Sequence, residues 1–151
     1  YPVVVQQGSI FVTSGSDRRS TGTHYTPRSL TAPVVRTTLE PLLYSGIDGG
    51  QEPAPERLKA PAEILSLKIC DFACGSGAFL VQACRYMSER LVEAWSLAEA
   101  SQPDIPLVVP EALPFGAHHS EQLLPSDLEE RLARVRRLVA ERCLYGVDVN
   151  L

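Results

Sequence analysis

The feature that most constrains the fold is a short apolar run that leads into a glycine turn and then into a long amphipathic stretch. Residues 64–71 predict an apolar strand, and residues 73–77 form a turn of small residues. Beyond the turn, apolar side chains recur at three- and four-residue steps, which predicts one long helix to about Ala100. Gly75 and Gly77 would let the backbone approach a ligand, and the helix start would offer unpaired N–H groups.

A second apolar run, residues 143–149, predicts a later strand that carries an acidic residue, Asp148, near its end. A strand, a glycine turn, a helix and a further strand make up the ligand-binding half of a doubly wound α/β fold. Asp71, at the end of the first strand, would face a polar or cationic part of the ligand. Asp148 would accept hydrogen bonds from both hydroxyls of a ribose.

The same turn argues against two common nucleotide sites. The dinucleotide pattern requires a third glycine where this sequence has Leu80, and an acid about 20 residues further on, whereas Asp148 lies far beyond that distance. The phosphate-binding G-x-x-x-x-G-K-[ST] pattern is absent from the sequence. Taken alone, a Gly-Ser-Gly turn also fits a tight strand-to-helix connection that binds nothing, so that interpretation stays open.

The first part of the chain predicts a short arm followed by a helix. Residues 9–13 are rich in β-forming residues and end at a turn signal, which favours a short strand or hairpin arm. Thr26 as N-cap and Pro27 as first helical residue predict a helix toward Tyr44, with a break near Pro41. Between this helix and the first strand, the composition of the chain predicts a loop.

The stretch between the two predicted strands contains an excursion and a second helix. Four prolines between positions 102 and 124 predict irregular structure. Ser126 and Glu129 fit a capping box. The helix that follows would bury an apolar stripe made of Leu128, Leu132, Val135, Leu138 and Val139.

Composition limits the classes of function. A hydrophobic share of 44% and a charged share of 21% are typical of a folded globular protein. The net charge of −4 gives no electrostatic footprint for a chain that grips nucleic acid by itself. The four cysteines form no C-x-x-C pair, so we expect reduced thiols and no metal site. No apolar run approaches the roughly 20 residues that cross a bilayer, so we expect no membrane partner and a cytoplasmic location.

Three segments, residues 21–27, 71–80 and 144–150, resemble ordered motifs of the adenine-specific DNA methyltransferases of restriction-modification and related phage-defence systems. The first resembles T-G-x-Y-Y-T-P, with His24 in place of the first tyrosine. The second resembles D-P-A-C-G-S-G-x-F-L, with Phe72 in place of the proline. The third resembles Y-G-x-D-x-N-P up to its asparagine. This order is that of the subgroup whose target-recognition region follows the catalytic region.

The resemblance implies an α/β chain with a partial Rossmann-like class I methyltransferase fold, that is, an incomplete parallel sheet with flanking helices behind a short β-arm and a helix. Residues 1–60 would hold the arm and the T-P box. Residues 61–151 would form the first part of the S-adenosylmethionine-binding domain, with a helical insertion at about 101–125.

The resemblance also implies roles for individual residues around S-adenosylmethionine. The methionine part of the cofactor would be covered by Tyr25, Thr26 and Pro27. Its amino and carboxylate groups would be lined by Asp71, Ala73, Cys74, Gly75 and Gly77. Phe79 would support the turn or wall the pocket. At the other end, Asp148 would bind the ribose hydroxyls and Val149 would touch the adenine face.

The implied reaction moves a methyl group from S-adenosylmethionine to the exocyclic amino group of adenine in DNA, after the base has left the stack. In the family this chemistry depends on an N-P-P-Y or D-P-P-Y loop, which the sequence lacks. We therefore expect a fragment without catalytic residues that is inactive by itself and would meet DNA through regions mostly outside it. Two alternatives stay open, namely a non-catalytic remnant or interaction module, and a methyltransferase of the same fold that acts on protein glutamine or on cytosine.

Overall fold

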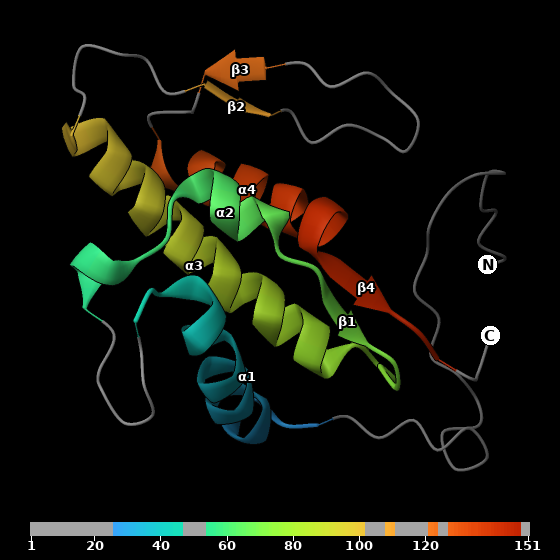
Figure 1. Ribbon diagram of the computed structural model, residues 1–151. Coiled ribbons are helices and arrows are strands. Elements are labelled where there is room, and N and C mark those ends of the chain that lie inside the picture. The colour runs from blue at the N-terminus through green and yellow to red at the C-terminus, as the bar shows by residue number, and fades with distance from the viewer. Residues whose placement is uncertain (1–25, 47–53, 102–107, 111–120, 124–126, 149–151) are drawn as a thin grey trace, which may run out of the picture.

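The protein is a mixed α/β chain that is mostly helical, with a small parallel sheet at one side (Figure 1). The computed structural model describes residues 26–46, 54–101, 108–110, 121–123 and 127–148. Its elements in chain order are α1 (Arg28–Leu43), the 3-10 helix η1 (Pro55–Arg57), α2 (Pro61–Ser66), β1 (Ile69–Asp71), α3 (Ala78–Ser101), β2 (Val108–Pro110), β3 (Glu121–Leu123), α4 (Leu128–Cys143) and β4 (Leu144–Gly146).

Strands β1 and β4 lie parallel, with Ile69 opposite Leu144 and Asp71 opposite Gly146. Parallel neighbours need a long crossover connection, which here includes α3 and α4. The predicted order of strand, glycine turn, long helix and later strand is therefore confirmed. Among the described residues, β4 is the only strand paired with β1, and the sheet has two strands.

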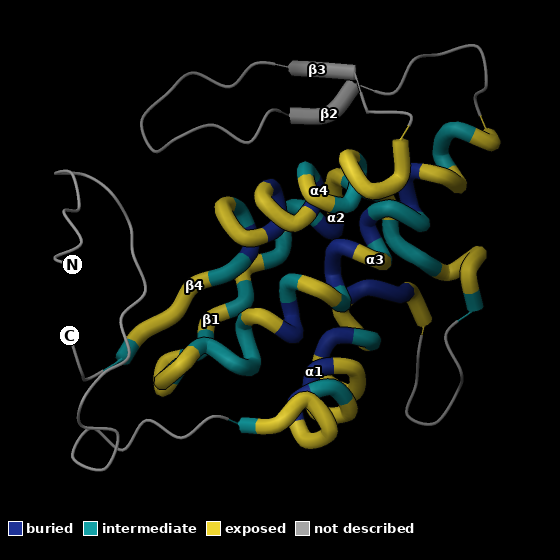
Figure 2. Tube along the Cα trace, turned by 180° about the vertical axis from the view of Figure 1, so that it is seen from behind, coloured by how far each residue is buried: buried dark blue, intermediate teal, exposed yellow. Residues whose placement is uncertain are grey.

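The core surrounds the long helix α3, which lies between α1 on one side and α2 and α4 on the other (Figure 1). Met87 and Leu91 of α3 are wholly buried, as are Val135 and Val139 of α4. In the view from behind, the buried residues lie where these helices face one another (Figure 2). Each such side chain contributes about 1.5–3 kcal/mol through removal from water, so the packing of α1 and α4 on α3 is the main source of stability.

Helix α1 begins one residue later than predicted and ends at Leu43, beside the predicted end at Tyr44. Pro27 has extended backbone angles and precedes the first helical residue, Arg28, so Thr26 is not the N-cap. The expected break near Pro41 is wrong, because the helix continues to Leu43. Pro41 lies in the last turn, where its missing N–H removes one i→i−4 hydrogen bond without ending the helix. The Tyr44 N–H donates to the Glu40 carbonyl at 3.0 Å and closes the end.

The strand predicted at residues 64–71 starts too early. Ile64 belongs to α2, and only Ile69–Asp71 form β1. Pro61 occupies the first turn of α2, and the Glu63 carboxylate accepts a hydrogen bond from the Ala60 N–H at 3.1 Å. Ile64 is wholly buried in this helix, and a short apolar run does not distinguish a buried helical turn from a buried strand.

The insertion and the second helix also differ from prediction in detail. The described residues near 101–125 include strands β2 and β3, which pair antiparallel, so the expected helical insertion is wrong for them. Helix α4 is capped by Asp127, whose carboxylate accepts from the Glu130 N–H at 2.9 Å, one residue later than predicted. Leu128 is 59% exposed and lies outside the buried stripe. Within the described part of the chain, no helix has the length and apolar character that a membrane span requires.

Candidate functional site

The connection between β1 and α3 has the backbone shape that its glycines predict. Gly75 and Gly77 have φ values of +50° and +75°, in the left-handed region that other residues adopt at a cost of roughly 1–2 kcal/mol. The Gly77 N–H donates to the Cys74 carbonyl at 2.7 Å, and the Val81 N–H donates to the Gly77 carbonyl at 2.8 Å. The chain therefore turns tightly and enters α3 directly.

Asp71 organises the start of this turn and also ties it to the chain beyond β4. Its carboxylate accepts from the Ala73 N–H at 3.1 Å, and its main-chain carbonyl accepts from the Val147 N–H at 2.8 Å. The Cys74 N–H then donates to the Val147 carbonyl at 3.0 Å. These two backbone bonds extend the contact of β1 with β4 past the last paired residues, so the turn and the end of β4 form one unit.

Close packing at Gly146 holds β4 against the turn. A Cβ atom at Gly146 would lie 2.8 Å from the Leu80 side chain and 3.1 Å from the Cys74 sulfur. Gly146 thus has a positioning role that the sequence analysis missed, although its place in the third motif was a signal. Cys74 is half-buried in this contact, which agrees with a packing role for its small side chain.

The acid after β4 faces the glycine turn. Asp148 is half-buried, and its Oδ2 lies 3.9 Å from the point that a Cβ on Gly75 would occupy. Asp71, Gly75 and Asp148 are thereby brought to the same edge, where β1 and β4 end. In parallel α/β sheets this carboxyl edge is where ligands bind.

Helix α1 begins at the same end of the molecule as the glycine turn. Along the two helices, Val35 and Phe79 line one cavity, the Tyr86 hydroxyl lies 3.3 Å from Glu40, and Arg90 lies 3.2 Å from the Tyr44 hydroxyl. This succession shows that α1 and α3 run parallel.

Thr26 and Pro27 therefore lie at the end of the molecule that carries the glycine turn. The two helix N-termini, each with a partial positive charge, point in the same direction. Tyr25 and Val149, which were also predicted to contact the cofactor, lie outside the described residues.

An apolar cavity of about 240 Å³ opens beside β1, between α1 and the start of α3. Phe79, Val34 and Leu39 supply apolar walls, and Asp71 supplies the polar rim. Phe79, which lines this cavity, also packs against the core. Phe72 lines the same cavity and is 82% exposed.

Two other kinds of site lack support in the described part of the chain. No group of three or more metal-ligating side chains is found there, and His118 and His119 lie outside it. Burial raises the pKa of the Cys84 thiol, against smaller opposing effects of Ser88 and of nearby arginines, and burial likewise raises the pKa of the Cys143 thiol. Both thiols are therefore poor nucleophiles near neutral pH.

No protein-family model matches this chain, and neither the curated proteins nor the solved structures contain a match. In its described part, the chain is a mixed α/β protein with a two-stranded parallel sheet, a glycine turn, and an acid at or just after the end of each strand.

Proposed function

We propose that this chain is the cofactor-binding part of a DNA methyltransferase that transfers a methyl group from S-adenosylmethionine to the exocyclic amino group of adenine. The observation that carries the proposal is the meeting of Asp71, the left-handed Gly75 and Asp148 at one edge of the parallel strands. The three resembling motifs lead to the same family. The finer fold would be a Rossmann-like sheet, in which further parallel strands lie beside β1 on the side that no described strand occupies.

The residues of the turn fit the cofactor chemically. The first turn of α3 offers N–H groups and a positive partial charge to the methionine carboxylate. The Asp71 carboxylate is suited to the methionine ammonium group, and the two oxygens of Asp148 are suited to the ribose hydroxyls. A side chain on Gly75 would narrow the space in front of Asp148, so a glycine at this position leaves room for a ligand.

The transfer itself requires an amine held in line with the methyl carbon and acceptors for the charge that develops on nitrogen. The sequence contains no Asn- or Asp-Pro-Pro-aromatic loop to provide them. We therefore assign cofactor binding to these residues and no catalytic residue. We expect the chain by itself to bind S-adenosylmethionine without methylating DNA, and DNA contacts to come from other regions.

Calorimetric titration with S-adenosylhomocysteine tests the proposal. We expect saturable binding with Kd between about 1 μM and 1 mM, the usual span for enzyme ligands. Asp148→Ala should weaken binding by about 100-fold or more, because two hydrogen bonds to a charged acceptor are lost. Glu89→Ala, which removes an exposed carboxylate on α3, is the matched control and should bind like the wild type. A folded wild-type chain that does not bind, or an Asp148→Ala variant of unchanged affinity, would refute the proposal.

A further inference from the structure

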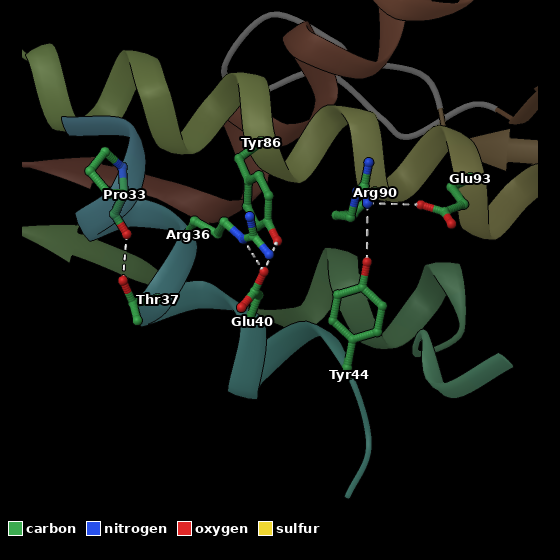
Figure 3. Close-up of polar contacts among 8 residues, drawn as sticks. All are labelled: Pro33, Arg36, Thr37, Glu40, Tyr44, Tyr86, Arg90 and Glu93. Atoms are coloured by element: carbon green, nitrogen blue, oxygen red, sulfur yellow. Dashed lines mark hydrogen bonds and ion pairs between the residues drawn. The ribbon is translucent and has the colours of Figure 1, made fainter. Parts of the chain in front are cut away.

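A second cavity lies further along the same two helices, away from the glycine turn. It has a volume of about 320 Å³ and is bordered by α1, by Pro55 of η1 and by α3. Unlike the apolar cavity beside β1, it is lined by charged and hydroxyl groups. Its size is at the lower end of the range of small-molecule sites. The side chains that face it are Arg36, Glu40, Tyr44, Tyr86, Arg90 and Glu93 (Figure 3).

Arg90 is held rigidly in the wall of this cavity by one of its terminal nitrogens. The NH1 group donates to the Tyr44 hydroxyl at 3.2 Å and pairs with the Glu93 carboxylate at 3.1 Å (Figure 3). The guanidinium carbon also lies 5.7 Å from the centre of the Tyr86 ring, within reach of a cation–π contact. Contacts from three directions fix the plane of the guanidinium before any ligand arrives.

The other edge of the same guanidinium carries a donor that no described residue satisfies. The Nε–H of Arg90 is buried and has no hydrogen-bond partner among the described residues. Nε and NH2 lie side by side on this edge and form a two-pronged donor that matches the two oxygens of a carboxylate. A buried donor without a partner is uncommon in proteins and calls for an explanation such as a bound group.

Glu40 supplies the opposite charge across the cavity. Its two observed contacts, from Arg36 at 2.6 Å and from the Tyr86 hydroxyl at 3.3 Å, both involve Oε1. Burial, followed by the nearby Glu40 charge, raises the pKa of Tyr86, so this hydroxyl stays protonated and keeps donating. The second carboxylate oxygen of Glu40 is the acceptor that remains for a ligand.

The charges of the lining disfavour a simple anion. Two arginines face two glutamates, so an isolated anion at Arg90 would lie close to the carboxylates of Glu40 and Glu93. We propose that this cavity binds a small zwitterion of the α-amino-acid class, with its carboxylate on the Nε and NH2 edge of Arg90 and its ammonium group on Glu40. This site is separate from the proposed cofactor site and does not depend on it.

Titration of the whole 151-residue chain by NMR tests this assignment, with L-alanine as the probe and with acetate and ethylammonium as separate half-probes. We expect L-alanine to shift the amide signals around Tyr86 and Arg90 to saturation. Each half-probe should bind about tenfold more weakly or worse, since it lacks one charge-assisted contact. Acetate that binds as tightly as L-alanine would overturn the proposal, as would a folded chain whose signals do not shift.

Arg90→Lys keeps the positive charge and removes the two-pronged edge, so the affinity for L-alanine should fall by about tenfold. Arg85→Lys, at an exposed position on the same helix, is the matched control and should not change it. Glu40→Gln should weaken L-alanine binding but leave acetate binding as strong or stronger, which provides a second test if Arg90→Lys folds poorly. Unchanged L-alanine affinity in both the Arg90 and the Glu40 variant would refute the site.

Discussion

The packing of Gly146 against the turn yields a prediction with a calculable magnitude. Gly146→Ala places a Cβ atom 2.8 Å from Leu80 Cδ1, 3.1 Å from the Cys74 sulfur and 3.5 Å from Cys74 Cβ. The Leu80 methyl group is the end of a flexible side chain and moves aside by a rotamer change. Cys74 has less freedom, because its N–H is bonded to the Val147 carbonyl. The strand must therefore shift by a few tenths of an ångström.

Overpacking of this kind lowers the free energy of unfolding by about 1–3 kcal/mol. Because the Leu80 side chain can move aside, we expect a loss in the lower half of that range. For a chain of 151 residues, a loss of about 1–2 kcal/mol corresponds to a fall in Tm of roughly 2–8 °C. The shift of β4 also moves Asp148 relative to Gly75, so S-adenosylhomocysteine should bind more weakly than the loss of stability alone explains.

Thermal unfolding followed by circular dichroism measures the first effect, and calorimetry measures the second. Gly46→Ala is the matched control, because Gly46 has a φ of +66° but no atom within 4 Å of an added Cβ. It should lose stability through backbone strain and keep its affinity. The double variant Leu80→Ala/Gly146→Ala should lose about 1 kcal/mol less stability than the sum of the two single variants, as expected for residues in contact. A Gly146→Ala variant with wild-type Tm and affinity would refute the packing argument.

Three further predictions concern stability. Met87→Ala removes a wholly buried side chain of α3 and should cost about 2–5 kcal/mol in urea unfolding, whereas exposed Leu97→Ala on the same helix should cost far less. Asp127→Ala removes the cap of α4 and should lower the free energy of unfolding by about 0.5–2 kcal/mol. Asp127→Asn can still accept the hydrogen bond and should lose much less stability. Equal losses in both variants would contradict a capping role. Burial raises the pKa of Cys143 above its usual 9.0, so the unfolded chain releases this proton first. Stability should therefore fall as pH rises past about 9, and Cys143→Ala should flatten that slope.

Long-range periodicity and the glycine turn were predictable from the sequence. The apolar stripe lies on one long helix of 24 residues, α3, so its helical period is unambiguous. The left-handed shape at Gly75 and Gly77 is imposed locally, since other residues adopt it at a cost. The parallel pairing of β1 with β4 followed from the order of these elements.

What the sequence did not predict depends on contacts between distant residues. Ile64 is apolar in either secondary structure, and its burial against the helical core leaves it in α2 rather than in a strand. Position 146 requires a glycine because the Leu80 and Cys74 side chains, about 70 positions earlier in the chain, leave no room for a Cβ atom. The polar cavity depends on Tyr86 and Arg90 meeting Glu40 and Tyr44, a separation of 46 residues in each pair.

The two backbone hydrogen bonds that join Val147 to Asp71 and Cys74 also couple the conformation of the glycine turn to that of the end of β4. Any ligand held by Asp148 and by the turn at the same time would resist the opening of these bonds, and by thermodynamic reciprocity a tighter pairing would raise its affinity. The amide protons of Cys74 and Val147 therefore serve as built-in reporters. Their exchange with deuterated solvent should slow together when a ligand occupies this edge, while amides at the far end of α3 keep their rates.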